Sequence, residues 1–287
     1  AEDGIRDVER SRGLGDVYKR QVEDSLEEFG PITDEELAYF EREAKRLYEE
    51  TDKAILGNFG GTGFGDIALV PAPWLKHPKG IRDVEEWYIS TVTRKEYVKA
   101  VFERQCEIAL DNLARIYEVV GNRVTAVFVT GTDFGAQQGP FISPRAYKEL
   151  YLPFHKRVND WIHTNTKWKS FIHSCGSVRK LIPAFIEAGF DIINPVQCSA
   201  ADMDPRELKR AFGDVLTFWG GGVDTQKTLP FGSVEEVRQE VAERIRIFGP
   251  GGGFVFNTIH NVQPLTPIEN VLAMYETLRE VGKYPIK

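Results

Sequence analysis

His173 and Cys175 are two metal-binding residue types separated by a single serine, in the sequence HSCG. Side chains two positions apart in a β-strand point to the same face, so both would face one side of a strand that runs through them. Imidazole nitrogen and thiolate sulfur are typical zinc ligands, and a catalytic zinc usually has three protein ligands. The spacing alone does not establish a metal, because a histidine packed beside a small cysteine is also common in protein cores.

A third ligand has to come from another strand end, and His260 in NTIHNV is the best placed of the other histidines. His77 lies in a loop, and His155 and His163 lie in a helical pattern, so we interpret these three as surface or capping residues. We therefore predict that His260 completes a metal site with the H-x-C pair.

Two aspartates also follow apolar runs, Asp133 in GTDFGAQQ and Asp224 in GGGVDTQ. Each could bind a metal, act as a general base or hold a histidine tautomer. The competing interpretation for each is a helix N-cap. We assign catalytic or substrate-orienting roles to Asp133, Gln137 and Asp224.

The elements that must position these residues alternate regularly between strand and helix. The apolar runs that predict strands span residues 53–61, 125–133, 168–176, 190–197, 215–224 and 253–262. The helical patterns between them include one that opens with a capping box, Thr33 with Glu36, and a long one at about 94–120 that ends at Gly121. Residues 65–90 are irregular and rich in Pro and Trp.

This alternation with short connections is typical of parallel βαβ units. About six units are present where a closed (β/α)₈ barrel needs about eight. A Rossmann-type open sheet is the alternative, but no G-x-G-x-x-G lies between a strand and a helix. We predict an α/β fold, a (β/α)₈ TIM barrel lacking about its first two strands, as a single domain over residues 31–287. Polar residues at the ends of all six runs predict a pocket there.

The first 30 residues are polar, contain several glycines and show no strand pattern. Residues 11–21, SRGLGDVYKRQ, resemble translated adapter sequence from assembled environmental DNA. We expect residues 1–30 to be non-native or disordered, and a flexible native N-terminus is the alternative. The sequence of the complete gene distinguishes the two.

Composition narrows the function classes. The 287 residues carry a net charge of -7, and without a Lys/Arg-rich run they offer no footprint for nucleic acid. No apolar run approaches the roughly 20 residues of a membrane span. Three cysteines are not a disulfide framework, so we expect a cytoplasmic enzyme, with Cys106 and Cys198 buried. Its partners would be small molecules, and homo-oligomerisation stays open.

Several motifs together resemble the uroporphyrinogen decarboxylase superfamily over residues 50–287: HSCG, FDIINPVQ, LKRAFG with LTFWGGGVDTQ, and GGFVFNTIHNVQPLTPIENV. The resemblance implies a (β/α)₈ barrel with its site at the strand C-termini, in which the run at 53–61 corresponds to the third strand. The decarboxylases bind a carboxylate-rich tetrapyrrole without a cofactor. Their tyrosine after the fourth strand is Phe154 here, which argues against decarboxylation, whereas their histidine of the last strand matches His260.

Another branch of that superfamily moves methyl groups between corrinoid proteins, thiols and small methylated substrates. It places zinc on an H-x-C pair that matches His173 and Cys175, and its third ligand, often cysteine, matches His260. GTDFGAQ and IHNVQ are similar to a subgroup that demethylates methoxylated or methylated compounds. The resemblance implies a zinc methyltransferase that works with a corrinoid partner protein. In this chain, we expect the pocket that binds cofactor and substrate to include Asn194, Gln197, Asn261 and Gln263.

Two alternatives stay open. The first is a cofactor-free carboxy-lyase that acts on a porphyrinogen, for which a pocket ringed with arginine would be expected. The second is a non-catalytic product, because a barrel without about two of its eight units exposes sheet edges.

Overall fold

The computed structural model describes residues 22–27, 29–60, 70, 72 and 75–286. The adapter-like segment at 11–21 lies outside the described residues, and so does most of the first part, 65–74, of the stretch at 65–90 that was predicted to be irregular. The described residues form two compact units, one made of those up to residue 132 together with 148–168, and the other of those at 133–147 and from 169 onward.

The first unit pairs two parallel strands and packs long helices beside them. Its strands align Leu56 with Ala126, and its elements are α3 (Asp34–Glu50), β1 (Leu56–Gly57), α4 (Val84–Thr93), α5 (Lys95–Val120), η1 (Gly121–Arg123), β2 (Ala126–Thr130) and α7 (Leu152–Asn165). The capping box at Thr33 and Glu36 is confirmed at the start of α3. The predicted end of the long helix at Gly121 is confirmed too, because this glycine caps the C-terminus of α5 with a φ of 58°.

The core of this unit is rich in aromatic side chains, and the burial of His155 within the unit corrects one prediction. Phe102 of α5 contacts Tyr151 and Phe154, with ring centroids 4.9 and 5.8 Å apart. Cys106 is fully buried as predicted. His155 is fully buried as well, so its interpretation as a surface or capping residue was wrong. Burial lowers the pKa of His155 to about 3, which keeps the imidazole neutral.

Part of the stretch predicted to be irregular is helical. Helix α4 begins after Asp83, whose side chain accepts the backbone N–H of Glu86. It buries Trp87 and Ser90 at helical spacing, a pattern that the preceding Pro- and Trp-rich residues obscure in the sequence.

The described end of the N-terminal segment has partners in the first unit. Val22 and Leu26 are buried, and the hydroxyls of Ser25 and Tyr97 lie 2.6 Å apart. Residues 22–27 therefore contribute to the core of this unit.

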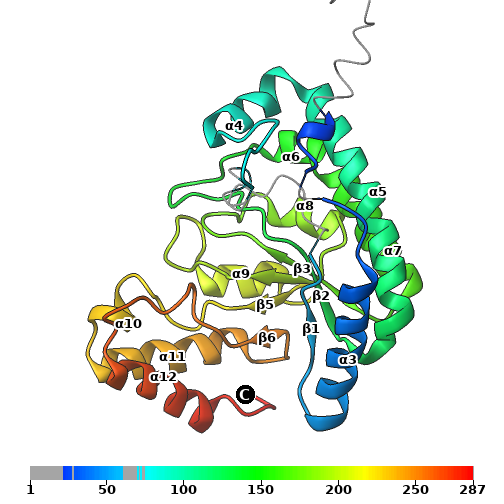
Figure 1. Ribbon diagram of the computed structural model, residues 1–287. Helices are drawn as coiled ribbons and strands as arrows, with labels where there is room; N and C mark the ends of the chain where they lie inside the picture. The colour runs from blue at the N-terminus through cyan, green and yellow to red at the C-terminus, as the bar shows by residue number, and fades with distance from the viewer. Residues whose placement is uncertain (1–21, 28, 61–69, 71, 73–74, 287) are drawn as a thin grey trace, which may run out of the picture. The chain divides into compact units, whose positions relative to one another are not determined.

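The second unit contains four parallel strands in the order of the chain, each followed by helix (Figure 1). Its register aligns His173 with Asn194, Ile193 with Phe218, and Trp219 with Val255. The elements are β3 (Lys169–His173), α8 (Ile182–Glu187), β4 (Ile192–Asn194), α9 (Pro205–Phe212), β5 (Thr217–Trp219), α10 (Thr228–Phe231), α11 (Val234–Phe248), β6 (Phe254–Val255) and α12 (Ile268–Val281). Helix α6 (Pro144–Leu150) crosses the boundary between the units.

These pairings confirm the predicted α/β class. A Rossmann sheet reverses its strand order at a switch point, whereas β3 to β6 follow the chain without reversal, as barrel strands do. Phe248 of α11 stacks on Phe254, with centroids 5.2 Å apart, and contacts Phe218, so this helix covers β5 and β6. None of the helices in the described ranges has the length and apolarity to span a membrane.

Candidate metal centre

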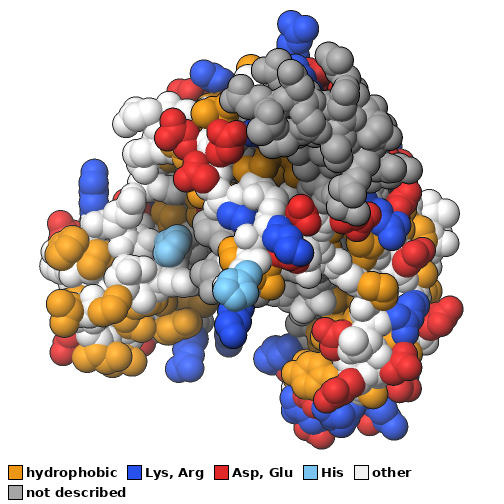
Figure 2. All heavy atoms as spheres, turned by 45° about the horizontal axis from the view of Figure 1, so that its top comes forward, with side chains coloured by type: hydrophobic (Ala, Val, Ile, Leu, Met, Phe, Trp, Pro, Cys, Tyr) orange, Lys and Arg blue, Asp and Glu red, His pale blue; other side chains and the backbone are white. Residues whose placement is uncertain are grey.

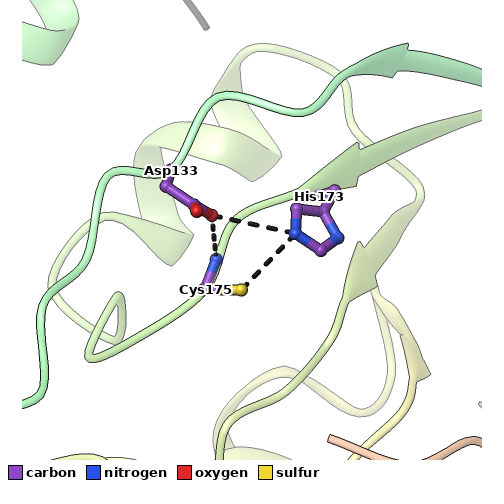
Figure 3. Close-up of side chains that lie close together, drawn as sticks. All are labelled: Asp133, His173 and Cys175. Carbon is purple, nitrogen blue, oxygen red and sulfur yellow. Dashed lines mark hydrogen bonds and ion pairs between the residues drawn. The ribbon is translucent and has the colours of Figure 1, made fainter. Parts of the chain in front are cut away.

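Three potential ligands meet where β3 ends (Figure 3). The Nε2 atom of His173 lies 3.4 Å from Cys175 Sγ and 3.8 Å from Asp133 Oδ1. The ligand atoms of the three residues all lie within 4.8 Å of one another. Ser174 lies between His173 and Cys175 in the sequence and is buried. Its hydroxyl oxygen accepts the backbone N–H of Phe134, away from the cluster. The predicted common orientation of His173 and Cys175 is therefore present.

Asp133 reaches this cluster because the loop after β2 is bonded to the turn after β3. Its Oδ1 atom accepts the backbone N–H of Cys175 at 2.6 Å. The N–H of Ser177 donates to the carbonyl of Ala136 at 2.8 Å. A Cβ on Gly176 would lie 2.3 Å from the carbonyl oxygen of Gly135, so the two backbones approach as closely as glycine permits.

The electrostatics of the cluster favour a bound cation. Burial, followed by the charge of Asp133 and a hydrogen bond to it, raises the pKa of the Cys175 thiol to about 12. The thiol is therefore protonated at neutral pH without a metal, and no Lys or Arg among the described residues contributes to lowering its pKa. One imidazole, one thiol and one carboxylate form a donor set that fits Zn²⁺, which deprotonates a coordinating thiol.

A cavity of about 650 Å³ adjoins the cluster, and Asp133 and Cys175 lie in its wall. The remaining described residues of the wall are Gln197, Thr225, Gln226, Pro230, Phe231, Ile259, His260, Gln263, Pro264 and Leu265. Neither Lys nor Arg occurs among them. Two apolar side chains of the wall, Phe231 and Leu265, are 84% and 100% exposed. They therefore form an apolar rim where the cavity meets the solvent. Figure 2 shows hydrophobic side chains gathered over the region of α10 and α12, at the lower left of that view.

His260 lies in the wall of the same cavity but outside the three-residue cluster. Its side chain is exposed, in the irregular segment after β6. Gln263 also lines the cavity, whereas Asn261 is exposed and its carbonyl accepts a hydrogen bond from Gln263. The structure thus brings Asp133 to the predicted histidine–cysteine pair in place of His260, whose ligand role stays a prediction.

Two glutamines hold the turn that carries Cys175. The Oε1 atom of Gln197 accepts the backbone N–H of Gly176 at 2.8 Å, and its Nε2 donates to Gln137 at 3.0 Å. Gln137 in turn donates to the carbonyl of Ser199 at 2.6 Å. Gln197 is among the described residues of the cavity wall, whereas Gln137 is not, and the roles predicted for both stay predictions.

Asp224 has the geometry of a structural residue. It is 8% exposed, and its carboxylate accepts the backbone N–H groups of Gln226 and Lys227 at 2.6 and 3.2 Å. It is not among the described residues of the cavity wall, and its two bonds hold the turn before α10, whose N-cap is Lys227 rather than Asp224. Its catalytic role stays a prediction.

Sequence reasoning missed the apolar rim. Pro230 and Phe231 belong to α10, which has four residues and is too short for a periodic signal. Pro264 and Leu265 lie in irregular chain after β6. A bulky apolar residue beside proline, just beyond a predicted strand end, was the available signal.

Replacement of the two competing third ligands separates their roles. We expect Asp133→Asn to weaken zinc binding about 10- to 100-fold, because an amide is a poorer ligand and the carboxylate lies in the cluster. His260→Asn is expected to change it less than about threefold. Competition with a chromophoric chelator measures both, and a larger loss in His260→Asn would identify the histidine as the third ligand.

Comparisons with known proteins identify the family and a similar fold. The model of the family described as "Uroporphyrinogen decarboxylase (URO-D)" matches residues 67–281. Uroporphyrinogen decarboxylases of Trichodesmium erythraeum and Carboxydothermus hydrogenoformans are 28% and 30% identical to the chain over 49% of its length, and the matches cover 38% of each relative. A solved methyltransferase structure from Methanosarcina mazei is similar to 85% of the chain, with a TM-score of 0.59 and 15% identity. The match covers 64% of that methyltransferase, and at this identity it shows the fold.

Proposed function

The chain belongs to the uroporphyrinogen decarboxylase family, and within this family we propose that it is a zinc-dependent methyltransferase. It would move a methyl group between a small methylated or methoxylated substrate, a corrinoid protein and a thiol or similar acceptor. The observation that carries this proposal is the cluster of Asp133, His173 and Cys175 in the wall of a cavity. The structural similarity to a methyltransferase is consistent with it.

The residues of the cluster would hold Zn²⁺ through Cys175 Sγ, His173 Nε2 and a carboxylate oxygen of Asp133. When bound, zinc supplies Lewis acidity and lowers the pKa of a thiol, alcohol or water. Methyl transfer is a displacement, so its rate depends on holding the nucleophile, the carbon and the leaving group in line.

Hydrogen bonds to the backbone position the turn that carries the Cys175 sulfur. Asp133 and Gln197 accept the consecutive N–H groups of Cys175 and Gly176, so the turn carrying the sulfur is held from two sides. The apolar side chains of Phe231, Ile259 and Leu265 offer a surface to a methyl or ring group.

Decarboxylation of a porphyrinogen is the second candidate, because the relatives named above are uroporphyrinogen decarboxylases. A tetrapyrrole with many carboxylates needs cationic partners, because a buried carboxylate is stable only when paired. The described wall of the cavity holds no Lys or Arg, and its one carboxylate, Asp133, would repel the substrate. The charge of the cavity therefore favours a substrate without several negative charges.

Metal analysis and two activity assays test the proposal. The purified protein is expected to bind about one zinc per chain and to transfer the methyl group of methylcobalamin to 2-mercaptoethanol. The new S–C bond forms as the Co–C bond breaks, the electron pair stays on cobalt as cob(I)alamin, and the thiol proton passes to solvent. Visible spectra follow the cobalt and mass spectrometry detects the thioether. Release of CO₂ from uroporphyrinogen by protein without zinc would contradict the proposal.

A further inference from the structure

Asn194 is buried behind the metal centre and contacts His173 on the side away from the other ligands. The register of β3 and β4 places the two residues opposite each other, and Asn194 is 9% exposed. Its Oδ1 atom lies 2.6 Å from His173 Nδ1, and its Nδ2 atom donates to the carbonyl of Trp219 at 2.9 Å. Each end of the amide therefore has a partner.

The carbonyl of Trp219 decides which way this amide points. A carbonyl oxygen can only accept, so the nitrogen of the Asn194 amide must face it. A flipped amide would place two oxygens against each other and lose this hydrogen bond. The oxygen of the amide is thus held toward His173.

The position of that carbonyl is constrained by the strands around it. Trp219 aligns with Val255 in the register of β5 and β6. The next residue, Gly220, has a φ of 113°, and a Cβ there would lie 2.3 Å from the carbonyl oxygen of Pro195. The chain after β5 therefore packs tightly on the residue that follows Asn194.

An amide oxygen facing Nδ1 selects one form of a neutral imidazole. Nδ1 must carry the hydrogen in order to donate to Asn194 Oδ1, which leaves the lone pair on Nε2. Nε2 is the nitrogen that lies 3.4 Å from Cys175 Sγ and 3.8 Å from Asp133 Oδ1. The free lone pair thus points at the place where the three ligand atoms meet.

We propose that Asn194 is a positioning residue that fixes the Nδ1–H tautomer of His173 and so prepares Nε2 to bind the metal. This inference rests on the metal site of the proposed function. The direct contact with substrate or cofactor that the sequence predicts for Asn194 stays a prediction, and Asn194 is not among the described residues of the cavity wall. Partners of metal-bound histidines of this kind typically change metal affinity 10- to 100-fold.

The experiment compares Asn194→Leu, which is similar in size but cannot accept a hydrogen bond, with a matched control. Asn112 is 5% exposed and also uses both ends of its amide, with the backbone of Ile32 and Gly30, far from this cluster in the sequence. Asn112→Leu therefore reproduces the loss of a buried amide. Asn194→Asp retains an acceptor for Nδ1.

Two measurements are made on each protein. Long-range ¹H–¹⁵N spectra of the metal-free proteins at about pH 8 report the tautomer of His173. A His173→Asn variant assigns the signals. Zinc affinity comes from competition with a chelator. We expect Nδ1–H in the wild type and in Asn194→Asp, a mixed or Nε2–H population in Asn194→Leu, and zinc binding about 10- to 100-fold weaker in Asn194→Leu than in Asn112→Leu.

The outcomes separate this inference from the proposed function. A wild-type His173 that carries its hydrogen on Nε2 overturns the inference, whatever the variants do. Equal zinc affinity in Asn194→Leu and Asn112→Leu overturns it too. If the wild type binds no zinc, the proposed function fails, and the spectra of the metal-free protein still decide whether Asn194 sets the tautomer.

Discussion

Cys175→Ser is expected to lose most of its bound zinc and, with it, methyl transfer. Zinc binding by a few protein ligands is worth about 10–16 kcal/mol, so loss of the thiolate should cost about 3 kcal/mol or more, at least about 100-fold in affinity. A serine hydroxyl at this place is a poor substitute, because it does not ionise under the conditions that convert a metal-bound thiol to thiolate. Metal content after dialysis and the methylcobalamin assay measure the two losses.

The same substitution should change how zinc binding depends on pH. The pKa of the Cys175 thiol is about 12, so the thiol holds its proton throughout the neutral range and zinc must displace it. Protons therefore compete with the metal, and the wild-type zinc affinity should rise about tenfold for each pH unit between about pH 7 and 9. Cys175→Ser should lose this slope, because it has no thiol proton to release.

Cys198→Ser is the control for this pair of measurements. Cys198 is half-buried, where the sequence predicted a buried residue. Burial of its thiol raises the pKa to about 12, and the thiol donates to the carbonyl of Val196. It lies outside the cluster, so its loss should leave zinc content, methyl transfer and the pH slope unchanged. Full zinc content and full activity in Cys175→Ser would remove the cluster as the basis of the function.

The strand–helix alternation and the orientation of His173 and Cys175 could be predicted because both depend on neighbouring residues. Side chains alternate along a strand, so two residues two positions apart share a face without information from the rest of the chain. The end of α5 at Gly121 is equally local, since glycine tolerates the positive φ found there.

The third member of the cluster depends on contacts between distant segments. Asp133 and His260 both lie at the ends of predicted strands, and from the sequence His260 was preferred as the third ligand. Asp133 enters the cluster because its carboxylate bonds the backbone of Cys175, 42 positions further along the chain. His260 lies in irregular chain beyond β6, where side-chain alternation no longer predicts a direction.

Burial of single polar residues was the other property that the sequence could not settle. His155 lies in a helical pattern that fits either an exposed or a buried position, and the structure buries it completely in the first unit. Asn194 was predicted to line the pocket, a role that stays a prediction, and in the structure its amide oxygen lies against Nδ1 of His173. Each outcome depends on which side of the element the neighbouring strands and helices cover.

Gly176→Ala is expected to destabilise the protein and to disperse the metal centre. Gly176 has a φ of 82°, which costs an alanine about 1–2 kcal/mol. Its Cβ would also lie 2.3 and 2.4 Å from the carbonyl oxygen and carbon of Gly135, which are backbone atoms and cannot rotate away. Overpacking adds about 1–3 kcal/mol, so the total should be about 2–5 kcal/mol, a fall in Tm of about 10 °C.

The clash also has to be relieved by separating the loop that carries Asp133 from the turn that carries Cys175. We therefore expect zinc binding to weaken more than it does in Asp133→Asn, because the carboxylate and the sulfur both move. The fall in Tm is measured on metal-free protein, so that lost zinc does not contribute to it. Zinc affinity is measured separately by chelator competition.

Gly251→Ala is the control that carries the backbone strain without the clash, so the difference between the two variants gives the steric part of the effect. Gly251 has a similar φ of 77°, but a Cβ there would meet nothing within 4 Å. It should therefore cost only the backbone strain of about 1–2 kcal/mol and leave zinc affinity unchanged. If Gly176→Ala melts at the same temperature as Gly251→Ala and binds zinc as tightly, the contact between Gly135 and Gly176 does not hold the cluster together. A larger fall in Tm together with lost zinc would show that this backbone contact sets the distance between Asp133 and Cys175.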